Sequence, residues 1–424
     1  MQIKYLPIVA VLLFAFSQSF AQQQLKYVWL LNEGRYEYIN QSQAIPVSLA
    51  RYDVQNKSYE EMLQLSDVRF GSDLLVTDEF IFMAVDTLLL KLDKFSLNEL
   101  DRATVRGIRK IAADDEHIYI TRGEYLVEFG SYFQYRDIDD LSMVTELDTL
   151  NGPRFATEGV GEKDGKVYIA INNGFDFGNE VGFLGMYESN GTYNEYDLGP
   201  NGANPDNLMM TENGIYTLNN KDYTGSSVSA VSYDFGGGST TDLSDVSAGC
   251  GTSMYYEDKV IYQEFGEDKL YAFNPSNSSV DDSLELDFEF YGLAADESGN
   301  MYATITDFVS SGSLLVFNSQ GARVDSVEVG VSAGNLALDY RSTVGIEGNL
   351  DLNLKLYPNP TKGNLRLTGD FEIASIRVFN TIGSLVDERE VESGELIWLD
   401  LNSGLYILES EVEGKIQADR LIIR

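Results

Sequence analysis

One strand-forming unit recurs along the first three quarters of this 424-residue chain, and its spacing limits the folds the chain can adopt. Each copy has an acidic or glycine-containing turn followed by a short apolar strand, as in TDEFIFMAV (77–85) and DDEHIYI (114–120). Four short strands with their turns need about 40 to 45 residues, the size of a β-propeller blade. The strand centres recur at intervals of 37 to 53 residues and therefore predict seven blades: Trp29, Phe82, Tyr119, Tyr168, Tyr216, Ile261 and Tyr302.

The two ends of this array indicate how the ring closes. Most copies follow an apolar strand such as IRKIAAD (108–114), but the first copy, YVWLLNEG (27–34), lacks one. A spare strand of that type, NLALDY (335–340), comes after the last copy. Pairing the two would complete one blade and remove two open sheet edges. The alternative is a β-sandwich whose strands recur at this interval by accident.

The first residues have the pattern of a secretory signal peptide. Lys4 supplies the positive charge, residues 8–16 form a short apolar stretch, and small residues end at Ala21, after which we expect cleavage. Residues 1–21 are then the signal peptide and residues 22–341 the propeller; a buried N-terminal helix is the alternative. No apolar run is long enough to span a bilayer, so we expect no transmembrane segment.

The sequence pattern changes after a linker at residues 342–348. Residues 349–424 contain alternating strands, and Tyr357-Pro358-Asn359-Pro360 favours an extended start. The length suits a small Ig-like β-sandwich. We therefore expect an all-β chain, with a seven-bladed β-propeller followed by this small domain.

Charge and composition weigh against several functions. The formal net charge is -37, which repels phosphate backbones, so nucleic acid is not an expected partner. His117 is the only histidine and is expected in an exposed turn, and Cys250 is the only cysteine, expected to be a buried, inert thiol. No zinc spacing or EF-hand loop occurs. We expect no enzyme, catalytic residue, metal site or cofactor.

The loops between the second and third strands of each blade should emerge on one face, together with the connections between blades. These loops combine aromatic residues with asparagine and glycine, a composition that suits polar cyclic ligands. The alternative is that the rings fold back onto the blades. The candidate ligand-binding rim consists of Asn32, Tyr36, Tyr38, Arg154, Phe177, Tyr223, Phe265 and Phe308.

The propeller resembles the YncE-like seven-bladed propellers of the Bacteroidota cell surface, in the branch that captures cobalamin for an outer-membrane transporter. The resemblance is carried by LNEG (31–34), SLARYD (48–53), YGLA (291–294), DFVSSG (307–312) and NLA (335–337). It implies a corrinoid ligand and a transporter partner. Members of that branch are lipid-anchored through an N-terminal cysteine, which this chain lacks.

The tail resembles the type A sorting domain of the type IX secretion system. The matching residues are YPNPTKG (357–363), Gly383, GLYIL (404–408) and the basic-apolar end at 420–424. The resemblance implies that the type IX translocon is a partner and that the protein passes through the periplasm to be secreted or attached to the outer cell surface. The candidate sorting-signal residues are Tyr357, Pro358, Asn359, Pro360, Gly363, Gly404 and Tyr406.

The function expected from these observations is a non-enzymatic surface propeller that captures a small polar ligand, with a corrinoid as the named example. A surface adhesion module for glycan or protein is the first alternative. A calcium-dependent lactonase-like hydrolase is the second; it would need acidic and amide oxygens converging on a central calcium, and no spacing in the sequence singles out such a set.

Overall fold

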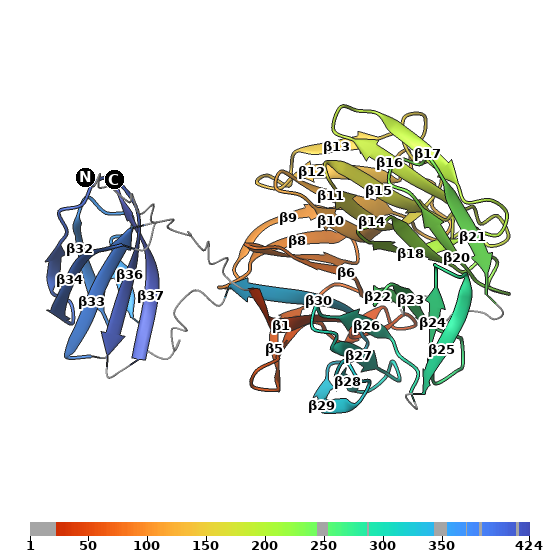
Figure 1. Ribbon diagram of the computed structural model, residues 1–424. Coiled ribbons are helices and arrows are strands. Elements are labelled where there is room, and N and C mark those ends of the chain that lie inside the picture. Colours follow the sequence, from red (N-terminus) through yellow and green to blue (C-terminus); the bar gives the residue numbers. More distant parts are fainter. Residues whose placement is uncertain are drawn as a thin grey trace, which may run out of the picture. The chain divides into compact units, whose positions relative to one another are not determined.

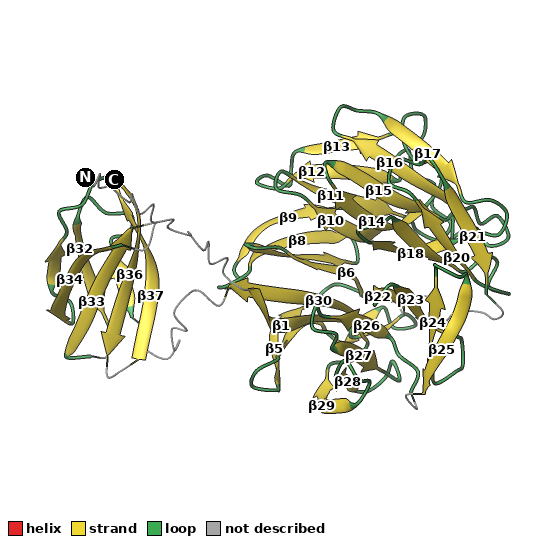
Figure 2. Ribbon diagram, viewed as in Figure 1, coloured by secondary structure: helices red, strands yellow, loops and turns green. Residues whose placement is uncertain are grey.

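The computed structural model describes residues 23–243, 253–285, 288–342, 354–369, 371–380, 384–412 and 415–424. The expected signal peptide, most of the linker, Cys250 and Gly383 lie outside these residues. Two compact units are present, one formed by Leu25–Tyr340 and one that contains Arg341–Arg424. Strands form both units (Figures 1 and 2), and no helix in the described residues is long and apolar enough to cross a membrane.

The first unit consists of four-stranded antiparallel sheets, one for each copy of the repeat. Six of them use consecutive strands. Blade 2 contains β6 (Gly71–Val76), β7 (Phe80–Val85), β8 (Leu88–Asp93) and β9 (Glu99–Thr104). Blade 3 contains β10 (Ile108–Ala113), β11 (His117–Arg122), β12 (Phe133–Asp137) and β13 (Val144–Leu147). Blade 4 contains β14 (Thr157–Lys163), β15 (Lys166–Ile171), β16 (Phe183–Glu188) and β17 (Tyr193–Asp197).

The remaining consecutive blades follow the same order. Blade 5 contains β18 (Pro205–Met210), β19 (Ile215–Asn219), β20 (Ser227–Val231) and β21 (Gly238–Asp242). Blade 6 contains β22 (Ser253–Tyr256), β23 (Lys259–Gln263), β24 (Lys269–Asn274) and β25 (Ser279–Glu285). Blade 7 contains β26 (Gly292–Ala295), β27 (Met301–Ile305), β28 (Gly312–Phe317) and β29 (Arg323–Val329).

Blade 1 is built from both ends of the propeller, as the sequence predicts. Its strand order is β30-β1-β4-β5, with β30 (Ala333–Ser342) beside β1 (Gln23–Asn32), followed by β4 (Val47–Asp53) and β5 (Ser58–Leu65). A buried polar contact reinforces the closure, because Asp339 on β30 accepts hydrogen bonds from Trp29 Nε1 at 3.2 Å and Lys94 Nζ at 3.1 Å. The expected seven-bladed propeller is confirmed, and the accidental-sandwich alternative is wrong.

The repeat forms blades because its apolar residues fall on both faces of the second strand. All seven predicted strand centres lie on the second strand of their sheet, and Trp29, Phe82, Tyr168 and Tyr302 are completely buried. One face of each such strand packs against the preceding blade and the other against the next. The cluster between blades 1 and 2, for example, joins Trp29 and Leu49 to Met83. Burial on both faces explains why these strands read as nearly continuous apolar runs.

The first strand of each blade faces the propeller axis. β6, β10, β14, β18, β22 and β26 contact one another in that order around the centre (Figure 1). Four of these strands have a β-bulge near their start, between Gly71 and Asp73, Ile108 and Ile111, Thr157 and Val160, and Pro205 and Asn207. A bulge redirects side chains and is common beside functional sites.

The C-terminal unit is a two-sheet β-sandwich. One sheet has the order β31-β32-β35 and the other β34-β33-β36-β37. The strands are β31 (Lys355–Tyr357), β32 (Asn364–Thr368), β33 (Ile373–Asn380), β34 (Leu385–Glu392), β35 (Leu396–Trp398), β36 (Gly404–Val412) and β37 (Lys415–Ile423). Leu365 and Leu367 of the first sheet and Ile376 and Leu408 of the second share one buried core.

Candidate functional site at the loop end of the propeller

The bulged starts of the inner strands lie at the same end of the propeller as the loops between second and third strands. This follows from the antiparallel order, because a second strand runs back to the end where the first strand began. We call this end the loop end. Blade 1 adds a short hairpin here, β2 (Arg35–Glu37) and β3 (Ser42–Ile45). The loops, the blade connections and the bulges therefore surround one mouth of the central axis.

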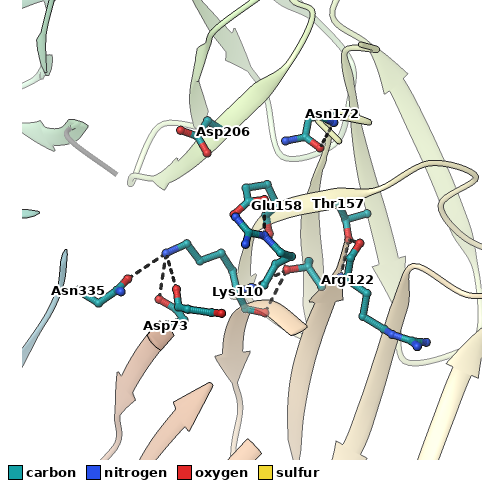
Figure 3. Close-up of polar contacts among 12 residues, drawn as sticks. Asp73, Lys110, Arg122, Thr157, Glu158, Asn172, Asp206 and Asn335 are labelled. Carbon is teal, nitrogen blue, oxygen red and sulfur yellow. Dashed lines mark hydrogen bonds and ion pairs between the residues drawn. The ribbon is translucent and has the colours of Figure 1, made fainter. Parts of the chain in front are cut away.

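A cluster of charged side chains occupies this mouth. Lys110 Nζ on β10 lies 3.3 Å from Asp73 Oδ1 on β6 and 3.0 Å from Asn335 Oδ1 on β30. Figure 3 shows the Lys110 amine pointing toward these two residues, with Asp206 above it and Glu158 beside the Lys110 side chain. The cluster therefore draws on five blades.

A second cation, Arg109, is fixed beside the first. Its guanidinium forms two 2.9 Å hydrogen bonds with the Glu158 carboxylate and lies 5.0 Å from the centroid of the Phe175 ring. Such a bidentate pair has a fixed geometry. Because Phe175 belongs to the loop between β15 and β16, this stack joins the charged cluster to the loops above it.

The electrostatics of the cluster favour its charged amine and penalise one of its acids. Burial opposes the charge on Lys110, but Asp73 and Glu158 more than offset burial, so the pKa of Lys110 is raised. Burial also raises the pKa of the Glu33 carboxyl, against the lowering effect of a 2.5 Å hydrogen bond from the Tyr291 hydroxyl. Burial therefore favours the protonated form of the Glu33 carboxyl.

Exposed aromatic rings surround the charged mouth. Six of the seven loops between second and third strands carry one, and all seven loops lie in the described residues. Their exposed fractions run from 47% to 73%, and the six rings are Tyr38, Tyr125, Phe177, Tyr223, Phe265 and Phe308. The loop of blade 2, between β7 and β8, is a short turn without a ring. Large rings left exposed in this number mark a surface suited to contact.

Three of these rings form a continuous row across blades 3, 4 and 5. The centroids of Tyr125 and Phe177 are 6.0 Å apart, and those of Phe177 and Tyr223 are 5.9 Å apart. The Tyr223 hydroxyl also donates a 3.3 Å hydrogen bond to the carbonyl of Gly174 in the neighbouring loop. The row is thus held by contacts between loops.

The predicted rim residues occupy different positions within this end. Tyr38, Phe177, Tyr223, Phe265 and Phe308 are the exposed rings, and Tyr36 packs edge-on against Tyr38 at 5.0 Å. Arg154 is exposed and lies 4.0 Å from Glu195.

Asn32, in contrast, lies beneath the surface. It is 1% exposed, and its amide donates to Ser48 Oγ and the Tyr59 hydroxyl within blade 1. Some rings do fold back, because Phe155 packs in the core between blades 3 and 4. The predicted rim thus mixes surface and interior residues.

Sequence reasoning missed both Tyr125 and the charged cluster. Tyr125 lies in the blade 3 loop between the second and third strands. The sequence pattern that could have identified it is an acidic residue directly before an aromatic one, and the other five ring-bearing loops have the same pattern. The signal for the cluster is a charged residue at the second or third position of an inner strand, where Asp73, Arg109, Lys110, Glu158 and Asp206 are found.

Of the two residues weighed for catalysis, His117 lies within the described residues, and it is away from the loop end. His117 is the first residue of β11, at the opposite end of that strand, where it is half-buried and packs edge-on against Tyr135 at 5.0 Å. The expected exposed turn position is therefore wrong for His117. Within the described residues no group of three or more histidine, cysteine or acidic side chains is arranged to hold a metal ion.

One predicted sorting residue, Asn359, fastens the start of the C-terminal unit to its last strand. Asn359 Nδ2 donates to the carbonyl of Arg420, and Asn359 Oδ1 accepts from the amide of Ile422 at 3.0 Å. Gly363 has φ +100°, and a Cβ there would lie 2.7 Å from a backbone oxygen. Tyr406 donates from its hydroxyl to Asn402 O at 3.0 Å, and Gly404 begins β36. Tyr357 ends β31, and Pro358 and Pro360 flank Asn359 in cis peptide bonds.

Comparison with solved structures finds distant likenesses to the chain. AztD from Citrobacter koseri is 11% identical with a TM-score of 0.46, over 93% of this chain and 100% of AztD. The dihydro-heme d1 dehydrogenase NirN in complex with DHE is 12% identical with a TM-score of 0.48, over 88% of this chain and 74% of NirN. A protein from Desulfotomaculum acetoxidans is 13% identical with a TM-score of 0.49, over 74% of this chain and 98% of that protein. No curated protein matches the chain.

The C-terminal unit has a specific match. Residues 355–424 match the family model of the secretion system C-terminal sorting domain. This range covers the sandwich from β31 to the last residue and includes every predicted sorting-signal residue. The tail is therefore a type IX secretion sorting domain, and the protein is secreted or attached to the outer cell surface.

Proposed function

We propose that the propeller is a non-enzymatic binding protein that captures a small polar ligand at its loop end, outside the cell. The observation that carries the proposal is the ring of exposed aromatic side chains around a charged mouth. Flat rings supply apolar contact area, and the charged and amide groups between them can orient a polar ligand. The C-terminal sorting domain supports the extracellular location, because it directs the protein out of the cell.

The arrangement of the mouth supports binding over hydrolysis. A lactonase-like site would need acidic oxygens free to hold calcium at the axis. Here Lys110 and Arg109 already lie among those oxygens, as fixed cations bonded to Asp73 and Glu158. A ligand recovered chemically intact after incubation with the protein, as judged by mass spectrometry, is the result expected of a binding protein.

A corrinoid is the first ligand to test, because the sequence resembles propellers that capture cobalamin. The probe is cyanocobalamin, titrated calorimetrically into wild-type protein and into Phe177→Ala, Tyr223→Ala and Phe308→Ala. Each stacked ring contributes about 1 kcal/mol, so each variant should bind roughly fivefold more weakly. The melting temperatures should not change, because all three rings are exposed.

Matched controls lie at the opposite end of the blades. Glu116 and Asp164 occupy turns between first and second strands, and their alanine variants should bind like the wild type. Loss of affinity in these variants, with the ring variants unaffected, would place the ligand at the wrong end of the propeller. If neither cyanocobalamin nor any short neutral saccharide bound at millimolar concentration, small-ligand capture would be overturned.

A further inference from the structure

The exposed rings of the loop end share a local pattern that the proposed function does not use. In each of the six loops an acidic residue comes directly before the ring. The pairs are Glu37-Tyr38, Glu124-Tyr125, Asp176-Phe177, Asp222-Tyr223, Glu264-Phe265 and Asp307-Phe308. They come from six different blades; in five of them the loop end presents a carboxylate beside a flat ring, whereas Glu264 in blade 6 is buried.

The three aspartates among these acidic residues hold the loops that present their rings. Asp307 accepts from the backbone amides of Val309 and Ser310 at 2.9 and 2.7 Å, and these bonds lower its pKa to about 2. Asp222 accepts from the hydroxyl and amide of Thr224, and Asp176 from the side-chain amide of Asn179. The following ring is therefore presented in a fixed place before any ligand arrives.

These carboxylates retain the capacity to bind a ligand. An ionised carboxylate has about four acceptor positions, and the loop hydrogen bonds use only some of them. Glu37 and Glu124 are also paired with Arg35 and Arg106, at 3.1 and 2.9 Å. Acceptors of this kind suit ligand hydroxyl groups, while their charge and the net charge of -37 disfavour an anionic ligand.

The spacing of the three rings in the row can be compared with the repeat length of a ligand. Successive centroids from Tyr125 through Phe177 to Tyr223 are 6.0 and 5.9 Å apart, close to the repeat of one pyranose unit in a linear saccharide. Neighbouring planes are tilted by 48° and 57°, so the row bends and does not form one flat plate. The apolar C–H face of a sugar stacks on an aromatic ring, and its equatorial hydroxyls project sideways toward acceptors.

We infer that the ligand captured at the loop end is a short, uncharged saccharide that lies along the row Tyr125–Phe177–Tyr223. Its sugar rings stack on the three aromatic side chains and its hydroxyls donate to the carboxylates of Glu124, Asp176 and Asp222. This inference rests on the proposed function, of which it names the ligand class.

The test is calorimetric titration of the full chain with a panel of neutral linear oligosaccharides of glucose, mannose, galactose and xylose, with oligogalacturonate as the anionic probe. At least one neutral saccharide should bind, and oligogalacturonate should not. Phe177→Ala removes the central ring and should weaken binding by roughly fivefold to tenfold, whereas Phe177→Tyr keeps a ring and should restore most of it. The matched control is Phe95→Ala, since Phe95 is 67% exposed in a turn at the opposite end.

Each other outcome overturns part of the argument. If cyanocobalamin binds and no neutral saccharide does, the saccharide inference fails and small-ligand capture stands. If nothing on either panel binds, both fail. If a neutral saccharide binds Phe177→Ala and wild type equally, or if oligogalacturonate binds as tightly as the neutral chains, the row is not the saccharide site. Melting temperatures of all variants establish that each is folded.

Discussion

Single residues at the mouth of the propeller show how burial and charge compete. Glu33 lies among the charged groups of the mouth and receives a hydrogen bond from Tyr291, yet burial raises its pKa. The native state therefore binds this proton more tightly than the unfolded chain does. By linkage, ionisation of this carboxyl lowers the free energy of unfolding as the pH rises from the ordinary pKa of 4.5 through the raised native pKa.

Glu33→Gln should remove this cost. The amide oxygen can still accept from the Tyr291 hydroxyl, but it carries no charge to desolvate. At pH 8 the variant should melt at a higher temperature than the wild type, and the difference should shrink toward zero as the pH falls below 4.5. Thermal unfolding from pH 4 to pH 8 measures it. A variant that is less stable than the wild type only at high pH would show that Lys110 and Arg109 make the ionised carboxylate a stabilising group.

The charged cluster is also where sequence reasoning reached its limit. Asp73 meets Lys110 across two adjacent blades, whereas Asn335 lies 225 residues after Lys110 and meets it only because the ring closes. The bulges that redirect Arg109 and Asp206 leave no mark in the strand alternation. Five of the six exposed rings were predicted, because loops rich in glycine and asparagine mark them in the sequence, and Tyr125 was missed. Asn32 is the opposite case, because this polar residue was predicted at the rim and is buried inside blade 1.

At the scale of elements, the repeat made the propeller predictable. Each second strand carries apolar residues on both faces, and each blade needs such a strand to pack against both neighbours. The same periodicity exposed the spare strand β30. What the pattern could not show is how the blades are joined by polar contacts, such as Thr121 Oγ1 to the carbonyl of Glu158 at 2.7 Å and Thr304 Oγ1 to that of Ala333 at 2.5 Å.

The closing strand offers a direct test of the ring. Lys94 and Asp339 form an ion pair whose side chains are 4% and 0% exposed, and it joins β30 to the turn after β8. Removing one charge of a buried pair leaves the other uncompensated, which costs about 3 to 5 kcal/mol. We therefore expect Asp339→Asn to lower the free energy of unfolding of the whole propeller by about 3 kcal/mol.

A second substitution separates charge from packing. Lys94→Met combined with Asp339→Asn removes both charges and should recover most of the lost stability, because an apolar replacement for a buried pair is often neutral. Urea unfolding of the three proteins gives the comparison. A double variant as unstable as the single one would show that Asp339 acts through Trp29 and not through Lys94, and an unchanged single variant would mean that closure does not depend on this contact.

The whole molecule combines a propeller with a sorting domain, and each has its own core. The buried clusters of the propeller contain only propeller residues, and the sandwich cluster runs from Leu354 to Ile423. The sorting residues likewise bond within their own unit, as Asn359 does with Arg420 and Ile422. Within the described residues the sandwich cluster and the propeller clusters have no member in common, so deletion of the sorting domain removes none of the described propeller core.

Deletion of residues 349–424 should therefore leave the propeller folded and change only its location. The truncated protein should unfold cooperatively and keep its ligand affinity, because its core and its loop end are intact. It should accumulate in the periplasm, since the sorting domain is the part handled by the type IX system. Surface labelling and cell fractionation measure the location, with the Phe177→Ala full-length variant as the control that changes the loop end and keeps the tail. Surface labelling of the truncated protein at the wild-type level would show that the propeller carries an export signal of its own. Loss of cooperative unfolding would show that the propeller needs the C-terminal domain to fold.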